Sequence, residues 1–316
     1  MFPSFPESFD LTPAELADID HLISNAFGRA LAPHVGRMPH TLYHYTTPTG
    51  FHGIVSSSVL RATHIAYTND SRELLHAVKL LRERIDPLLG VAVGAVRAML
   101  VDMAAGLDAT TEFNTMPIAI ACFCEDGDLL SQWRGYGAGE GGIAIGFESA
   151  ALAGLARSVP PSYLAPVIYE PSTQTAFVDA LLKDIVSEYA KLVGSHPTPG
   201  PRLQADFLTI LGAKTTGLAA LFKDNGFASE KEWRLVRNIT KTGELNFSPR
   251  ATHLAPTVDI EFPRRESGHS LPIAELCFGP GRYQAHAFHS CGALLTHHGY
   301  LSTPVQMSKT PFRSIS

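Results

Sequence analysis

The stretch MPIAIACFC at residues 116–124 is an apolar run rich in strand-forming residues, and it decides the class of fold. A second run of the same kind, GIAIGF, occupies residues 142–147. The glycine-rich residues 135–142 between them predict a loop, because closely spaced glycines favour neither a helix nor a strand. The two runs therefore predict two apolar β-strands.

Shorter strand-like runs lie on both sides of these two. They occupy residues 42–46, 60–67, 165–169, 233–236, 258–262, 273–278 and 304–307. Helical patterns separate the strands without a regular alternation. This order favours an α+β fold over a doubly wound parallel sheet.

Apolar residues at helical spacing predict the helices. The first helix follows Thr12-Pro13-Ala14-Glu15, which supplies a cap, a proline at the first helical position and a capping-box glutamate. A second helix begins near Ser71, and a third, rich in small apolar residues, covers about residues 88–107. Residues 173–222 return to a helical pattern, which proline and glycine interrupt at 196–201.

These patterns predict the organisation of the chain. We expect an N-terminal helical segment over residues 1–39, followed by a single α+β domain over residues 40–316. The domain carries a helical insertion at about residues 173–222.

The composition excludes some classes of protein. Of 316 residues, 45% are hydrophobic and 17% are charged, so the chain is too apolar to be a disordered tail. The formal net charge of −5 gives no overall basic excess for holding a nucleic-acid backbone. Any phosphate binding must therefore come from a few placed cations such as Arg72 and Arg134.

We expect a cytoplasmic protein that has no membrane partner. The four cysteines lie in or beside apolar runs, which is typical of reduced, buried thiols. The N-terminus lacks the basic and apolar regions of a signal peptide. Arg97 and Asp102 interrupt the most apolar stretch, so it does not predict a membrane span.

Polar clusters at predicted strand ends are the candidate site residues, since such positions often present reactive groups. One contains His44 and Thr46, and another contains Tyr67, Asn69 and Asp70. His44 on a strand is either a functional acid–base group or a structural histidine. Tyr67 is either a stacking platform or a packing residue.

Glu230 and Glu232 are two residues apart, so on a strand they share one face. In a cleft, one carboxylate can hold a ribose hydroxyl or stabilise positive charge while the other orients it. The alternative is an edge strand with solvated charges. Trp233 and Leu235 on the opposite face are expected to belong to the core.

Ser131, Gln132, Trp133 and Arg134 form a third cluster. Gln132 and Arg134 can position amide or phosphate groups of a ligand. A purely local role is the alternative, with Trp133 packing and Arg134 paired to a carboxylate. The glycine-rich residues 135–142 that follow lack the lysine and the helix of a phosphate-binding loop.

The 14 histidines raise the question of a metal. A C-terminal group contains His286, His289, Cys291, His297 and His298, which makes a metal-dependent hydrolase an alternative. The chain has neither an HExxH motif nor a CxxC pair. We therefore expect no metal.

Several of these motifs occur in a familiar order. They are LYHYT at 42–46, IAYTNDSRE at 65–73, CFC at 122–124, LSQWRGYG at 130–137 and EKEWR at 230–234. In this order the chain resembles the bacterial family called Domain of Unknown Function 2971, to which residues 278–280 and 308–313 are also similar. The resemblance covers roughly residues 40–313, and the family name implies no activity.

A more distant resemblance is to ADP-ribosyltransferases, above all to the bacterial toxins that modify DNA bases. It rests on the strand containing His44, the later pair Asn69 and Asp70, and a glutamate in a late strand. The resemblance implies a split α+β core of two sheets that grips NAD, used as a co-substrate, between them. It also implies a role in a toxin or anti-phage system.

The resemblance implies roles for the motif residues around NAD. His44 would hydrogen-bond a ribose hydroxyl, with Thr46 supporting that end. The backbone of Tyr45 would meet the nicotinamide carboxamide, and Tyr67 would stack on the nicotinamide ring. The expected cofactor-binding set is completed by Asn69, Asp70 and Arg72.

The resemblance makes Glu232, Glu230 and His44 the expected catalytic residues. Glu232 would bind the nicotinamide ribose and stabilise the oxocarbenium-like charge as the glycosidic bond breaks, and Glu230 would face the acceptor. Arg234 and the cluster at residues 131–134 would contact the substrate or support the site.

The sequence thus predicts an NAD-dependent ADP-ribosyltransferase that acts on an unknown protein or nucleic-acid acceptor, with an antitoxin or defence protein as a further partner. A non-catalytic module that binds a nucleotide and signals to a partner is the second alternative, beside the metal-dependent hydrolase.

Overall fold

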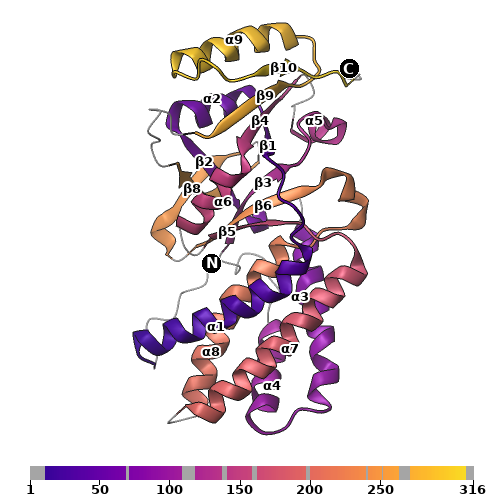
Figure 1. Cartoon of the computed structure of the whole chain (residues 1–316), viewed down its shortest axis with the longest axis vertical. Coiled ribbons are helices and arrows are strands. Elements are labelled where there is room, and N and C mark those ends of the chain that lie inside the picture. Colours follow the sequence, from indigo (N-terminus) through magenta and orange to yellow (C-terminus); the bar gives the residue numbers. More distant parts are fainter. Residues whose placement is uncertain are drawn as a thin grey trace.

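The structure is a computed structural model, in which the described residues form a sheet above a bundle of helices (Figure 1). The described residues are 11–68, 71–108, 118–136, 141–158, 162–196, 200–239, 241–250, 252–262 and 271–310, without the side chains of 71–74, 219 and 242. None of the helices in these ranges is long and apolar enough to cross a membrane.

Ten strands in these ranges are joined into one sheet. They are β1 (Thr41–Thr46), β2 (Val59–His64), β3 (Ile118–Cys124), β4 (Ile143–Glu148), β5 (Ser162–Pro166), β6 (Glu232–Asn238), β7 (Leu245–Pro249), β8 (Leu254–Glu261), β9 (Ile273–Phe278) and β10 (Val305–Met307). All pairings between them are antiparallel except that of β9 with β10.

The sheet branches at β3. One edge of β3 pairs with β6 along its whole length, and β5 lies on the far side of β6. The other edge of β3 is divided, because β1 pairs with its end at Cys124 whereas β2 pairs with Ala119 and Ile120. One branch continues from β1 through β4, β9 and β10, and the other continues from β2 through β8 and β7.

The predicted α+β class is confirmed. The described strands form one sheet that is joined through β3, so the split core of two sheets is not confirmed. The predicted strand at 60–67 is shorter than expected, because β2 ends at His64 and residues 65–67 form the 3-10 helix η2 (Ile65–Tyr67). Strand β7 was not predicted from the sequence. It pairs with β8 alone and is largely exposed, so it lacks a strong apolar signal.

Helices from separate stretches of sequence form the bundle. They are α1 (Pro13–Leu31), α3 (Ser71–Leu89), α4 (Gly94–Asp108), α7 (Pro171–Ser195) and α8 (Pro201–Thr215). The predicted capping box of the first helix is confirmed, since Thr12 and Glu15 satisfy each other's backbone N–H groups. The helix expected over 88–107 is wrong at its start, because α3 continues through Pro87 in its last turn and α4 begins at Gly94.

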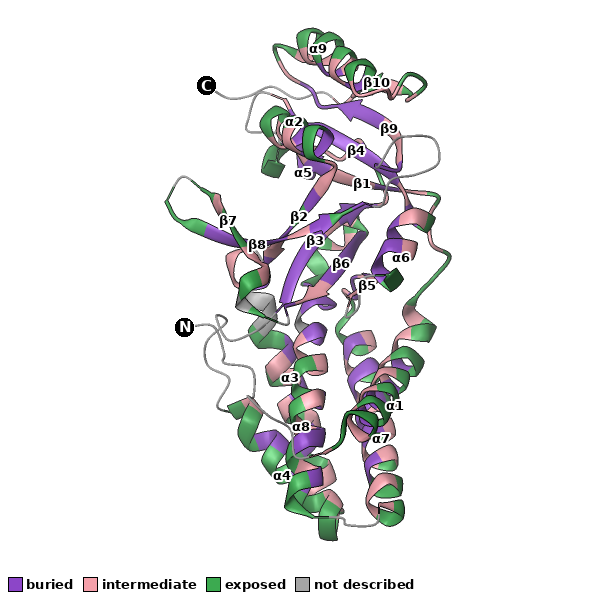
Figure 2. Cartoon of the chain, turned by 90° about the vertical axis from the view of Figure 1, so that its left-hand side faces the viewer, coloured by how far each residue is buried: buried purple, intermediate pink, exposed green. Residues whose placement is uncertain are grey.

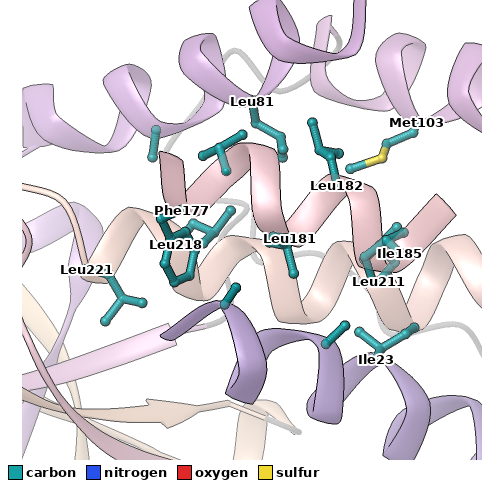
Figure 3. Packing of buried hydrophobic residues seen from close by; sticks show 14 of the residues in the cluster. Ile23, Leu81, Met103, Phe177, Leu181, Leu182, Ile185, Leu211, Leu218 and Leu221 are labelled. Atoms are coloured by element: carbon teal, nitrogen blue, oxygen red, sulfur yellow. The ribbon is translucent and has the colours of Figure 1, made fainter. Parts of the chain in front are cut away.

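The core of the bundle is apolar and continuous with one face of the sheet. Leu81, Phe177, Leu181 and Leu211 meet between the helices (Figure 3). The same cluster includes Ile118 and Ile120 of β3, together with Val236 of β6. The side chains of β3 alternate, so this face of the sheet packs on the bundle.

The opposite face has its own core. Ala119, Ala121 and Phe123 of β3 lie in it with Trp233 and Leu235 of β6. The helices that cover this face are α2 (Pro48–Ser57), α6 (Ser149–Ser158) and α9 (Gln284–His297). The central strands are therefore buried on both faces (Figure 2).

The short helix α5 (Leu130–Tyr136) is tied to the C-terminal segment through Asp128. The Asp128 carboxylate accepts from the Trp133 indole N–H at 2.8 Å, the Lys309 backbone N–H at 3.0 Å and the Thr310 hydroxyl at 3.1 Å, and also from the Ser308 hydroxyl. Burial raises the pKa of Asp128, but these hydrogen bonds outweigh it and lower the pKa below the ordinary value.

We expect Asp128→Ala to reduce the free energy of unfolding by about 2 kcal/mol, because the substitution leaves several donors without their charged acceptor. The pKa of Asp128 is lowered on folding. The stabilisation by its carboxylate is therefore complete above the pKa of the unfolded chain, and it is lost as the pH falls through the lower pKa of the folded chain. Urea unfolding at pH 7 and near pH 3 measures both values. A difference from the wild type that did not shrink at the lower pH would contradict this assignment.

Candidate functional site

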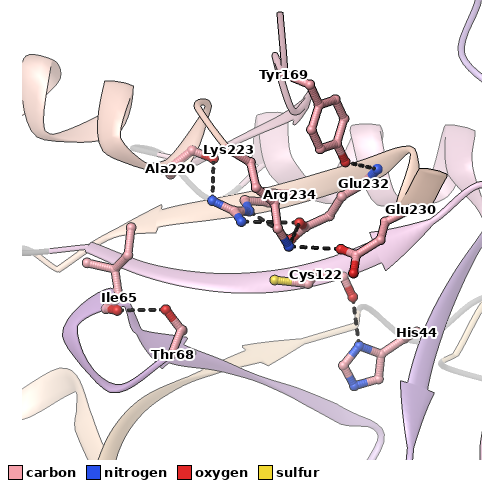
Figure 4. Close-up of polar contacts among 10 residues, drawn as sticks. All are labelled: His44, Ile65, Thr68, Cys122, Tyr169, Ala220, Lys223, Glu230, Glu232 and Arg234. Atoms are coloured by element: carbon pink, nitrogen blue, oxygen red, sulfur yellow. Dashed lines mark hydrogen bonds and ion pairs between the residues drawn. The ribbon is translucent and has the colours of Figure 1, made fainter. Parts of the chain in front are cut away.

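Four charged side chains meet at the beginning of β6, on the side of the sheet that faces the bundle. Glu232 and Arg234 belong to β6, and their side chains alternate with Trp233 on the other face. Lys223 lies just beyond the 3-10 helix η4 (Thr216–Ala220), and Glu230 ends the 3-10 helix η5 (Asn225–Glu230). We call these four residues the ion-pair cluster (Figure 4).

The ion-pair cluster alternates in charge. The guanidinium of Arg234 contacts both oxygens of Glu232, through Nε at 2.7 Å and through Nη2 at 3.1 Å. The ammonium of Lys223 lies 3.0 Å from Glu232 and 2.8 Å from Glu230. The order is therefore Arg234, Glu232, Lys223, Glu230, with two positive and two negative groups.

The inner members of the cluster are almost completely buried. The side chains of Arg234, Glu232 and Lys223 are 1%, 4% and 6% exposed, and that of Glu230 is 12% exposed. Burial alone would raise the pKa of Glu232, but Arg234 and Lys223 outweigh it and hold the pKa at about 2. Glu232 is therefore a permanent anion at neutral pH.

Backbone contacts fix the cluster to the sheet. Arg234 Nη1 donates to the carbonyl oxygen of Ala220 at 3.1 Å, which joins β6 to η4. The backbone N–H of Glu232 donates to the Tyr169 hydroxyl at 2.8 Å, and its carbonyl accepts from the Val167 N–H at 2.9 Å. Glu232 is thus held by both its backbone and its side chain.

A cavity of about 320 Å³ lies beside the cluster, where β3 ends. Its wall is formed by the loop after β3, the turn before β6 and one tyrosine of β1. The lining residues are Tyr43, Glu125, Asp126, Gly127, Leu129, Ser229, Glu230 and Lys231. Three carboxylates and one ammonium group give the cavity a negative potential at neutral pH. Glu230 belongs both to this cavity and to the ion-pair cluster.

The cavity wall is held by further contacts. The Trp233 indole N–H donates to Glu125 at 3.0 Å, and the Tyr43 hydroxyl donates to Glu275. A Cβ atom at Gly127 would lie 2.5 Å from the Tyr43 ring, so the close approach of this loop to β1 requires glycine. These contacts hold the wall of the cavity in place.

His44 lies at the branch of the sheet. Its Nδ1 is 2.9 Å from the carbonyl oxygen of Cys122, and its ring packs on Phe123. Burial lowers the pKa of His44 more than this hydrogen bond raises it, so the ring is neutral at pH 7 with the proton on Nδ1. Because the thiol of Cys122 also hydrogen-bonds Glu232, this one residue connects His44 with the ion-pair cluster.

The other expected NAD-binding residues are dispersed. Tyr45 is buried against Trp133, with its hydroxyl on the carbonyl oxygen of Asp126 at 2.8 Å. Tyr67 lies on the β2 branch and packs against His64 and His253. Thr46 is the last residue of β1, and its hydroxyl occupies the space that a Cβ atom at Gly50 would need.

Three further predicted residues cannot be placed. Asn69 and Asp70 lie outside the described residues, and so does the side chain of Arg72. The NAD-binding set as a whole therefore stays a prediction.

The cluster at residues 131–134 forms part of α5. Trp133 is buried and packs against Tyr45, in agreement with the local alternative, and Gln132 is buried as well. Ser131 and Arg134 are exposed. Within this cluster, Arg134 is the cation that remains accessible to a ligand.

The expectation that Glu230 and Glu232 share a strand face is wrong. Strand β6 begins at Glu232, and Lys231 before it has a left-handed backbone with φ of 42°, which breaks the alternation. The ammonium of Lys223 brings the two carboxylates together instead. The expected core positions of Trp233 and Leu235 are confirmed.

The C-terminal histidines belong to α9 and its end. The rings of His286 and His289 pack on Tyr283 and Phe288, and those of His297 and His298 pack on each other. In the part of the chain that the structure describes, no group of three or more His, Cys, Asp or Glu side chains is arranged to hold a metal ion.

Comparison with known proteins gives a match to a family model. The family model described as Protein of unknown function (DUF2971) matches residues 132–235. The DUF2971 match runs from α5 to β6 and includes every member of the ion-pair cluster. It supports the resemblance to this family that the sequence motifs indicate. No curated protein and no solved structure matches the chain, and the resemblance to ADP-ribosyltransferases stays a prediction.

Several residues of this site were missed in the sequence. Lys223 is the clearest case, and its only signal is that it directly follows the apolar residues 217–222. Glu125 and Asp126 carry no motif of their own, and Tyr43 lies in the LYHYT motif without having been singled out as a site residue. They become neighbours only when β1, the end of β3 and the turn before β6 converge.

We expect Arg234→Met to reduce the free energy of unfolding by about 3–5 kcal/mol, because it leaves the buried Glu232 short of positive charge. The matched control is Arg61→Met, which removes an exposed pair with Asp259 at 3.6 Å and should cost less than about 1 kcal/mol. Urea unfolding of both variants at pH 7 measures the difference. Equal losses would contradict the assignment.

Proposed function

We propose that this protein is an NAD-dependent ADP-ribosyltransferase whose nicotinamide site is the cavity beside the ion-pair cluster. The observation that carries the proposal is the combination of a carboxylate-lined cavity with Glu230 in its wall. The volume of about 320 Å³ falls within the range of about 300–1,000 Å³ that is usual for small-ligand pockets.

The chemistry of the cavity suits the nicotinamide end of NAD. The N-glycosylated nicotinamide ring is the cationic part of NAD, and Glu125, Asp126 and Glu230 supply the opposite charge. The ring of Tyr43 offers an aromatic surface for a flat cation. The diphosphate must extend away from these carboxylates, and Lys231 at the rim can meet it.

The proposed reaction breaks the bond between nicotinamide nitrogen and the ribose carbon, with the electron pair leaving on nicotinamide. Positive charge then develops on the ribose, and a carboxylate in the wall stabilises it. A nucleophile of the acceptor forms the new bond to the ribose carbon and loses its proton. Glu230 takes that proton in this proposal, because it lines the cavity whereas Glu232 does not.

This proposal assigns the two glutamates different roles. Both oxygens of Glu232 are already bound, one by Arg234 Nε and the other by Arg234 Nη2 and Lys223. A carboxylate whose two oxygens are both hydrogen-bonded in this way is suited to hold neighbouring side chains in position, and not to bind a substrate. Glu230 is the carboxylate that we propose to contact NAD, and the acceptor is a protein or a nucleic acid.

We expect Glu230→Gln to lower the rate of nicotinamide release from NAD on the order of 10²-fold or more, because it removes both the proposed proton acceptor and one of the negative charges that stabilise the transition state. Purified protein is incubated with NAD and a cell lysate that supplies acceptors, and nicotinamide is quantified by chromatography. The control is Glu83→Gln, which changes an exposed glutamate of α3 and should leave the rate unchanged.

A wild-type chain that binds NAD but releases no nicotinamide would favour a non-catalytic nucleotide-binding module. A chain that neither binds NAD nor releases nicotinamide would overturn the proposal altogether.

A further inference from the structure

We propose that Lys223 is a positioning residue that fixes the carboxylate of Glu230 in the cavity wall by tying it to Glu232. The inference rests on the proposed function and adds to it the residue through which the ion-pair cluster acts on the site. Figure 4 shows the Lys223 ammonium between the two carboxylates.

The side chain of Glu230 is not fixed by apolar packing of its own segment. The helix η5 is a short 3-10 turn without buried residues, and Lys231 after it has a left-handed backbone. A carboxylate on such a turn is free to rotate into water unless a contact holds it. The ammonium of Lys223 at 2.8 Å provides that contact.

Glu232 makes the ammonium itself immobile. Arg234 holds Glu232 with two hydrogen bonds, and Glu232 in turn lies 3.0 Å from Lys223. Because Glu232 remains ionised, it keeps a constant charge opposite Lys223 across the neutral pH range. The ring of Phe227 adds a cation–π contact at 4.8 Å from the ammonium nitrogen.

The backbone of Lys223 is anchored as well. Its N–H donates to the carbonyl oxygen of Ile168 at 3.2 Å, and its own carbonyl accepts from Gln174 Nε2 at 3.1 Å. Gln174 is buried, and its Oε1 lies 2.8 Å from His76 Nε2 on α3. Lys223 is therefore fixed at its backbone and at its ammonium group. Through the ammonium it holds the side chain of Glu230 in the cavity wall.

Lys223→Met tests the inference, because methionine keeps most of the buried volume while removing the charge. We expect kcat for nicotinamide release to fall on the order of 10²-fold with KM little changed, as for a misplaced reacting group. Lys79→Met is the control, since Lys79 forms an exposed pair with Glu83 on α3.

A double-mutant cycle separates positioning from a merely structural role. If Lys223 acts through Glu230, Lys223→Met should lower kcat little further once Glu230 is already glutamine. Losses that multiply in the double variant would overturn the inference, and so would an unchanged kcat in Lys223→Met. Should this variant not fold, Lys223→Gln supplies the same comparison with a neutral hydrogen-bond donor in place of the ammonium.

The inference and the proposed function fail in different ways. A wild-type protein that releases no nicotinamide refutes the function, and the crystal structure of Lys223→Met then decides the inference alone. A Glu230 carboxylate that has left the cavity wall supports positioning by Lys223. A carboxylate that stays in place refutes it.

Discussion

The two positive and two negative groups of the ion-pair cluster are buried, so they must be paired with one another. The geometry of the site depends on this constraint. Removing charges from water is costly, and only close opposite charges with well-formed hydrogen bonds offset that cost. Arg234 and Glu232 come from a sheet strand, whereas Lys223 and Glu230 come from the segment between the bundle and that strand. Pairing them fixes where the segment after η4 meets the sheet.

A buried ion pair is not by itself a source of stability, because well-packed apolar residues often serve a fold equally well. The pairing gives this chain a set of charges in defined places next to a cavity. The inner glutamate stays ionised, and the outer one reaches the cavity wall. The branch at β3 contributes to the same geometry, since the end of β3 leads directly into the loop that lines the cavity.

Much of the fold follows from local sequence signals. The capping box at Thr12 and Glu15, the apolar strands β3 and β4, and the alternation that buries Trp233 and Leu235 are encoded by neighbouring residues and were predicted. The extension of α3 through Pro87 and the exposed strand β7 were not, because tertiary contacts rather than local pattern decide them. Glu230 and Glu232 were singled out in the sequence, but the reason for their proximity was not predicted. That reason is Lys223, an unremarkable residue in the sequence whose partners are set by the packing of η4 against β6.

We propose that the cavity beside the ion-pair cluster receives the nicotinamide end of NAD. A crystal structure of the full chain with a non-hydrolysable NAD analogue is the decisive experiment. We expect the nicotinamide ring between Tyr43 and Glu230, with the diphosphate directed past Lys231. An analogue bound elsewhere, such as in the apolar cavity of about 210 Å³ between α3, α4 and α8, or no binding at saturating concentration, would contradict it.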